Sequence, residues 1–139
     1  MIIDEIKKFI ATCPLVKGKK IKVNNLDETP LSMTIDQVPG NPVIKKYVDG
    51  GSQRQTNFVL ASREEYDAQT WKQIEVANFY ENLQEWFEEQ NHNKNLPELG
   101  NSLRALRIEV TSSGYLYSSD TKTARYQIQC RLIYYKEGR

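Results

Sequence analysis

The chain has 139 residues and a mass of 16.2 kDa, which is the size of one ordinary domain spanning residues 1–139. Hydrophobic residues make up 39% and charged residues 27%, a balance that argues against disorder and requires neither a metal nor a disulfide for folding. A net charge of +1 supplies no strong field for capturing nucleic acid, and no stretch approaches the roughly 20 apolar residues of a membrane-spanning helix.

The first segment predicts a short amphipathic helix over residues 2–12. Apolar residues recur there at helical spacing, with Asp4 and Glu5 early and lysines late, as the helix dipole favours. Pro14 ends this helix, and the basic run 17–22 leads into a short strand through Val23. We interpret the basic run as a solvated turn, with contact to DNA phosphates as the alternative.

From residue 31 to residue 62 the hydrophobic period changes to two, which is typical of half-buried strands. The expected strands are 31–36, 43–48 and 56–62. Two prolines force a turn at 39–42, and two glycines supply a hairpin turn at 49–52. An antiparallel meander is therefore expected.

The helical period returns between residues 70 and 90. The apolar stripe consists of Trp71, Ile74, Ala77, Tyr80, Leu83, Trp86 and Phe87. We predict a long amphipathic helix whose aromatic side chains cover one face of the sheet. The polar segment 91–95 is predicted to end the helix in an exposed loop that contains His92.

The last third predicts two long antiparallel strands, near 106–111 and 125–134, where apolar and polar residues alternate. The connection 112–123 is longer than a tight hairpin needs, so we expect a protruding loop. The fold class predicted is α+β, with an antiparallel β-sheet packed against a long amphipathic helix and a short N-terminal helix.

No motif in the sequence points to catalysis. His92 is the sole histidine and stands among asparagines, and there is no G-x-S-x-G motif. The acid pairs 64–65 and 88–89 are adjacent in sequence, so they would splay apart as solvated groups. We expect no catalytic residue, no cofactor and no metal. A small enzyme and a ligand-binding α+β module are the alternatives.

The two cysteines, Cys13 and Cys130, stand far apart, and neither has a second thiol or a histidine at the spacing of a zinc site. Residues 1–10 lack the unbroken apolar run of a signal peptide, so we expect a reducing compartment in which both remain thiols. A disulfide between them stays open on sequence alone.

Charge is distributed unevenly along the chain. The long helix is acidic, and the C-terminal strands are basic through Arg104, Arg107, Arg125 and Arg131. Complementary patches of this kind suit head-to-tail contacts, which close into rings or continue as filaments. The alternative is that these charges pair within the monomer or keep it in solution.

Three ordered stretches resemble one protein family. They are 39–64, which begins PGNPVIKKYVDGGS; 86–100, which begins WFEEQN; and 111–135, which contains TSSGYLY and TARYQIQCRLIYY. Together they are similar to the small tail-terminator proteins, often labelled minor capsid proteins, of long-tailed bacteriophages and prophages of Gram-positive bacteria. The resemblance implies an antiparallel sheet flanked by helices, in subunits that associate as a sixfold ring on the end of the tail tube.

The resemblance also implies partners and a location. The ring would stop polymerisation of the tail-tube protein, present a face to the head–tail connector proteins and leave a channel through which DNA only passes. No membrane is involved, and the chain would act in the tail or neck of the virion after assembly in the bacterial cytoplasm. A head-to-tail connector or stopper subunit is the alternative.

A ring subunit needs contact surfaces, and tyrosine and arginine in loops are suited to them. The candidate assembly-interface residues are Tyr47, Asp49, Arg54, Tyr115, Tyr117, Arg125 and Arg131. The alternative for Tyr47 and Tyr117 is that they pack on the edges of the sheet of their own chain.

Overall fold

The computed structural model describes residues 2–16, 21–23, 32–65, 70–100, 102–119 and 123–138. These residues form two α-helices, one 3₁₀ helix and six strands. In chain order the elements are α1 (Ile2–Ala11), η1 (Pro14–Val16), β1 (Ile21–Val23), β2 (Ser32–Val38), β3 (Val43–Lys46), β4 (Ser52–Glu65), α2 (Thr70–Asn93), β5 (Leu103–Ser119) and β6 (Thr123–Lys136). The start of the predicted basic run, 17–20, lies outside the described residues.

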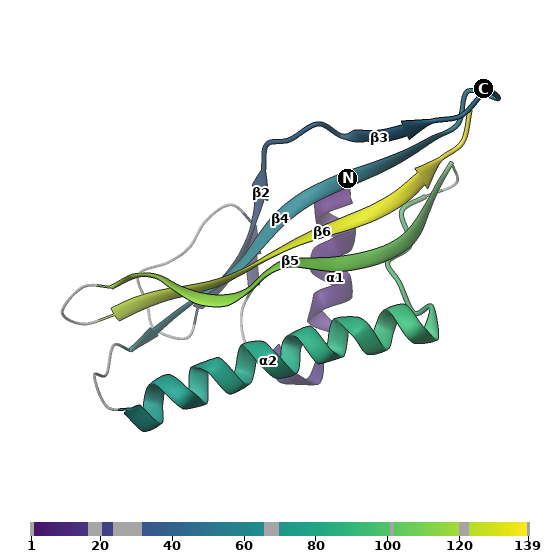
Figure 1. Ribbon diagram of the computed structural model, residues 1–139. Helices are drawn as coiled ribbons and strands as arrows, with labels where there is room; N and C mark the ends of the chain where they lie inside the picture. The colour runs from purple at the N-terminus through teal and green to yellow at the C-terminus, as the bar shows by residue number, and fades with distance from the viewer. Residues whose placement is uncertain are drawn as a thin grey trace.

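The strands form one sheet in the order β1-β2-β4-β6-β5, and β3 pairs with β4. All strand pairs are antiparallel except β1 with β2, which is parallel. The predicted α+β class, with an antiparallel sheet and a short N-terminal helix, is confirmed. Figure 1 shows α2 running along the length of the sheet and α1 running across it.

The simple meander predicted for residues 31–62 is wrong, because β2 and β3 follow each other along the same edge of β4. Val38 is opposite Asn57 on β4, and Val43 is opposite Arg54. β4 has 14 residues and β2 has 7, so the edge of β4 has room for a second strand. The segment between them, with its prolines at 39 and 42, interrupts the ladder without reversing the chain.

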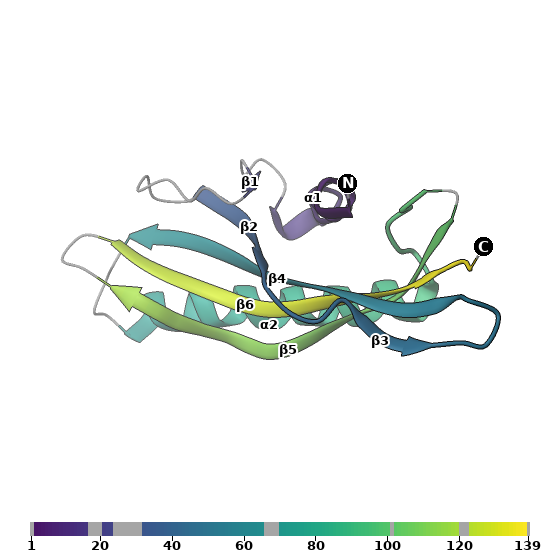
Figure 2. The same cartoon turned by 90° about the horizontal axis from the view of Figure 1, so that it is seen from above.

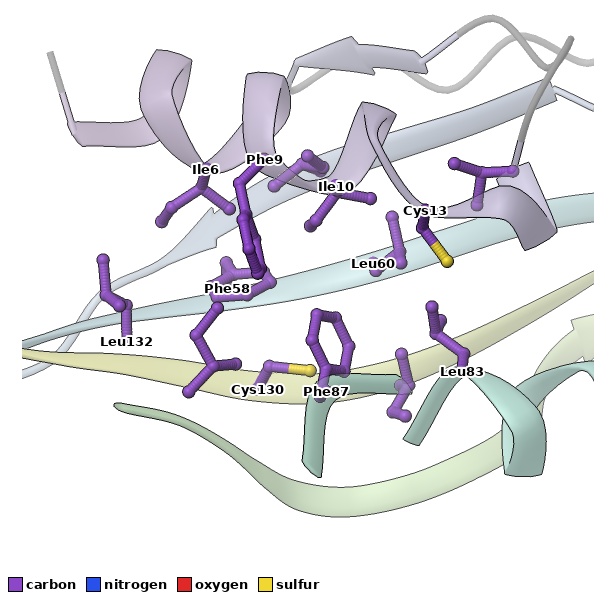
Figure 3. Close-up of a cluster of buried hydrophobic side chains, with 14 of the residues drawn as sticks. Ile6, Phe9, Ile10, Cys13, Phe58, Leu60, Leu83, Phe87, Cys130 and Leu132 are labelled. Carbon is purple, nitrogen blue, oxygen red and sulfur yellow. The ribbon is translucent and has the colours of Figure 1, made fainter. Parts of the chain in front are cut away.

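Both helices contribute to one hydrophobic core on the same face of the sheet (Figure 3). Ile6 and Ile10 of α1 and Leu83 of α2 are fully buried in it, and the rings of Phe9 and Trp86 lie 5.1 Å apart. The strands add the buried side chains Met33, Ile35, Phe58, Leu60, Ile108, Ile128, Cys130 and Leu132. Burial of this apolar surface is the main contribution to stability.

The buried stripe of α2 differs from the predicted one. Its buried residues are Val76, Tyr80, Leu83, Phe87 and Gln90, whereas Ile74 and Ala77 are exposed. Steps of alternately four and three residues stay on one side of a helix, but the predicted steps of three slip by about 60° each, since one residue turns the helix by about 100°. The side chain of Trp71 lies outside the described residues.

Two polar contacts fix α2 to the sheet. The buried hydroxyl of Tyr80 donates to the Tyr126 carbonyl at 3.0 Å and lies 2.5 Å from the Ser62 hydroxyl, so this side chain crosses β5 to reach β6 and β4. Gly114 of β5 makes the crossing feasible, because a Cβ there would collide with Tyr80.

The second contact is made by Asn91, near the C-terminal end of α2. Its side-chain amide donates to the Ile108 carbonyl at 2.6 Å, and its side-chain oxygen accepts from the Ile108 amide at 2.8 Å. The two bonds satisfy the backbone N–H and C=O groups of Ile108 on β5 and fix the position of α2 along that strand.

The end of α2 and the start of the last hairpin also differ from prediction. Asn93 ends the helix, so His92 lies in its last turn and is exposed. The next residue, Lys94, adopts the left-handed conformation at φ 57°, and the amide of Asn95 donates to the Gln90 carbonyl at 3.0 Å. This is a Schellman cap, in which the left-handed position is usually glycine. Because Lys94 occupies that position, the cap had no signal in the sequence.

The predicted loop is wrong for residues 112–119, because β5 continues to Ser119 and pairs with β6 along this length, and residues 120–122 lie outside the described residues. The register of β5 shifts at several points between Val110 and Ser118. Each irregularity resets the alternation of apolar and polar residues, which is why the sequence pattern failed to show a strand. Tyr115 and Tyr117 therefore lie on β5, and their side chains are outside the described residues.

Replacing Gly114 tests the close approach of α2 and β5. We expect Gly114→Ala to lower the free energy of unfolding by about 1–3 kcal/mol, because the added methyl group overpacks the site against Tyr80. Chemical denaturation monitored by circular dichroism measures this change. Gly40→Ala is the matched control, since only the flexible amide of Asn57 lies within 3 Å of the added atom. Equal stability of the two variants would contradict the contact.

Candidate assembly surfaces

The β3–β4 hairpin forms an arm, defined here as residues 43–54, which projects past the C-terminal end of α2 (Figure 2). Backbone bonds close its turn: the Tyr47 amide donates to the Gly51 carbonyl at 2.8 Å, and the Gly50 amide donates to the Tyr47 carbonyl at 3.1 Å. The Asp49 carboxylate accepts from the Gly51 amide at 2.8 Å. The turn is thus locked by three hydrogen bonds within itself.

Aromatic and cationic side chains brace the arm against the sheet. The ring of Tyr47 lies 6.0 Å from that of Tyr135 on β6, and a Cβ on Gly51 would collide with the Tyr135 hydroxyl. Lys45 stands over the Tyr47 ring at 5.4 Å, and Arg104 of β5 stands over the Tyr135 ring at 5.7 Å. This row of contacts crosses the sheet from β3 to β5 and orders the arm.

Exposed apolar side chains gather on and beside the arm. Ile44 is 44% exposed, Tyr47 is 40% exposed and Val48, in the turn, is fully exposed. Val38, just before the arm, is 42% exposed. Among the described residues one other large hydrophobic side chain, Ile74 on α2, is comparably exposed. An apolar cluster at the end of a braced arm is typical of a contact surface.

The arginines on the other face of the sheet have partners within the chain. Arg125 pairs with Asp36 of β2 at 3.1 Å. Arg131 and Arg107 both pair with Glu109 of β5, at 2.6 and 2.7 Å. Of the two interpretations of the basic strands, pairing within the monomer therefore accounts for these three arginines. The pair of Arg131 and Glu109 joins the neighbouring strands β6 and β5 and contributes to holding them in register.

The outer side of α2 keeps its acidic charge. Glu81, Glu85, Glu88 and Glu89 are exposed, and no ion pair joins any of them to another described residue. Residues 74–93 contain five glutamates and no lysine or arginine. This acidic side, defined as Glu81, Glu85, Glu88 and Glu89, carries a negative field that can select a basic partner surface.

A groove of about 720 Å³ opens beside the C-terminal end of α2 and the start of β5. Its walls are largely apolar, through Leu96, Pro97, Leu99, Leu103, Ala105 and Leu106. Lys94, Glu98 and Arg104 add charges to the lining. Such a concavity suits an apolar side chain flanked by charged residues.

The structure separates the predicted interface residues into two groups. Tyr47, Asp49 and Arg54 lie together on the arm, where Arg54 donates to the Ser52 hydroxyl at 2.9 Å. Arg125 stands opposite residue 63, near the other end of the β4–β6 ladder. Tyr47 contacts its own sheet through Tyr135 and remains partly exposed. Packing on its own sheet is therefore compatible with a role in an assembly contact.

Sequence reasoning missed Val48 and the groove. An apolar pair, Tyr47-Val48, directly before an Asp-Gly-Gly turn could have indicated an exposed apolar tip, because hairpin turns normally carry polar residues. The groove had no such signal, since its walls come from a loop and a strand that become neighbours only in the folded chain.

The described residues contain no cluster of three histidine, cysteine or acidic side chains suited to holding a metal. Cys13 and Cys130 are free and buried, and burial raises the pKa of both thiols above its ordinary value. Neither described helix combines the length and apolar character needed to span a membrane.

No protein-family model matches the chain, and no curated protein sequence is significantly similar to it.

The ion pairs of Glu109 predict a pH dependence. The hydrogen bond from Arg107, assisted by Arg131, holds the pKa of Glu109 below its ordinary value of 4.5. The unfolded chain therefore binds the proton more tightly, so the stabilisation from this carboxylate is complete above pH 4.5 and is lost as the pH falls through the lower folded value.

We accordingly expect the melting temperature of the unmodified protein to fall more on acidification than that of Glu109→Gln, which lacks the titrating group. Thermal melts at a series of pH values from about 7 to about 3 measure the difference. Glu88→Gln is the control and should follow the unmodified protein, because no described residue pairs with Glu88. Parallel losses in the Glu109 variant and the unmodified protein would contradict the ion pairs.

Proposed function

We propose that the chain is a structural assembly protein of a long-tailed bacteriophage or prophage, a tail terminator. Its subunits form a ring that caps the tail tube, ends tail polymerisation and joins the tail to the head connector. The observation that carries the proposal is the ordered resemblance of residues 39–64, 86–100 and 111–135, which includes the exposed surfaces of the fold as well as its core.

The places of these stretches in the fold support the proposal. The first forms the arm and β4, the second forms the end of α2 and a wall of the groove, and the third forms much of β5 and β6. The resemblance implies an antiparallel sheet flanked by helices, and the fold agrees with it at that level. A shared core alone would indicate a fold, whereas shared exposed surfaces also indicate shared contacts.

In this proposal α2 acts as the long amphipathic helix of the subunit. Its inner side, with Val76, Leu83 and Phe87 buried, packs towards β5, and its outer acidic side faces partners. A subunit of a ring must present two different surfaces to its two neighbours, together with others towards the tube and the connector. The arm, the groove and the acidic side are three such surfaces on one small chain.

The proposal places the protein in the virion tail or neck, with DNA passing through the axial channel. No chemistry is required of the chain, and its work consists of binding. Apolar contacts provide most of the affinity in such assemblies, and charged groups at their rim provide the selection among partners.

Tube capping can be measured directly. The tail-tube protein encoded in the same genome would be polymerised alone and with increasing amounts of this chain, and the tubes imaged by negative-stain electron microscopy. We expect shorter tubes with extra density at one end, because a bound ring blocks further addition of subunits. Tubes of unchanged length without bound chain would contradict capping, and binding to connector rings in their place would favour a stopper subunit.

A further inference from the structure

The arm and the groove lie at opposite edges of the sheet but at the same level along it. Lys46 of β3 is opposite Ser52 of β4, Ser52 is opposite Lys136 of β6, and Lys136 is opposite Leu103 of β5. One row of paired residues therefore runs from the base of the arm to the wall of the groove. We propose that the arm of one copy of this chain inserts into the groove of a second copy.

The apolar character of the two surfaces matches. Val48 at the turn is fully exposed and Ile44 is 44% exposed, while leucines and a proline form the groove walls. Burying a valine side chain removes apolar surface of both partners from water. This hydrophobic contribution to the affinity does not depend on a precise orientation. The volume of about 720 Å³ accommodates the turn of a hairpin with such side chains.

The arm is already ordered in the single chain, so little conformational freedom remains to be lost on binding. The turn bonds of Asp49 and Tyr47, the tilted ring contact between Tyr47 and Tyr135 and the close fit of Gly51 all hold it in one shape. A preordered contact segment binds more tightly than a flexible one with the same side chains, because its conformational entropy has already been lost when the chain folds.

The charges are complementary as well. Lys45 and Lys46 lie on β3, and the groove lining contains Glu98, with the acidic side of α2 beside it. Asp49 in the turn has Lys94 of the groove lining as a counterpart. Opposite charges around an apolar centre set the register of a contact and exclude a copy approaching in the wrong orientation.

An arm-in-groove contact is heterologous, because each copy uses one edge of its sheet to bind the other edge of its neighbour. Contacts of this type repeat from copy to copy and close into a ring when the rotation between copies permits. The inference rests on the proposed ring and identifies the contact that joins its subunits.

Site-directed cross-linking tests the contact in the full-length protein. Val48→Cys and Ala105→Cys, the latter in the groove wall, would be prepared as separate variants, mixed and treated with a short thiol–thiol cross-linker. We expect a covalent dimer that contains one copy of each variant. The native cysteines are buried and should stay unreactive. Ile74→Cys replaces Val48→Cys in the control mixture, because Ile74 is exposed but lies on α2, and this mixture should give no dimer.

A second measurement uses affinity. Val48→Asp should raise the dissociation constant of self-association about tenfold or more, as expected for losing one buried valine contact, whereas Ile74→Asp should leave it unchanged. Thermal melts of both variants verify that each remains folded.

The outcomes separate this contact from the ring itself. Rings without the mixed cross-link, or cross-links of Val48→Cys only with itself, would overturn the arm-in-groove contact and leave the proposed function standing. If the unmodified chain associated neither alone nor on tail tubes, the arm-in-groove contact and the proposed function would both be overturned.

Discussion

The β4–β6 ladder is the constraint on which the rest of the structure depends. It pairs all 14 residues of β4 without a register shift. One part of the ladder lies under the core, where Phe58 and Leu60 are buried between the helices and the sheet. The ladder then continues beyond the core to Ser52, so the arm is an extension of the core sheet, and its direction is set by the same hydrogen bonds that hold the core together.

The charges of the chain divide between internal support and external contact. Arg125 and Arg131 pair with carboxylates on other strands and Arg107 pairs with Glu109 of its own strand, so two carboxylates offset part of the basic character expected of the sheet. Glu81, Glu85, Glu88 and Glu89 on the outside of α2 form no ion pair with another described residue. In the proposed ring, electrostatic selection of partners therefore depends on the helix and the arm more than on the strands.

The sequence predicted the parts of the fold that follow a regular period. The helix at residues 2–11, the strand at Ser32–Val38 and the hairpin turn before Ser52 all carry local patterns that tertiary contacts did not override. The extension of β5 was missed, because its register shifts and the close approach of Gly114 to Tyr80 of α2 depend on neighbours distant in sequence. The arm was predictable as a hairpin, but the groove opposite it required the folded chain.

Assembly of the chain into a ring can be tested by measuring the mass of the purified protein in solution. Light scattering over a concentration series, with negative-stain imaging of any large species, gives that mass and the shape of the particle. We expect a closed particle of about six subunits, seen as rings, that persists over the series. A mass of one subunit at every concentration, with no ring in images of the protein alone or mixed with tail tubes, would contradict ring assembly.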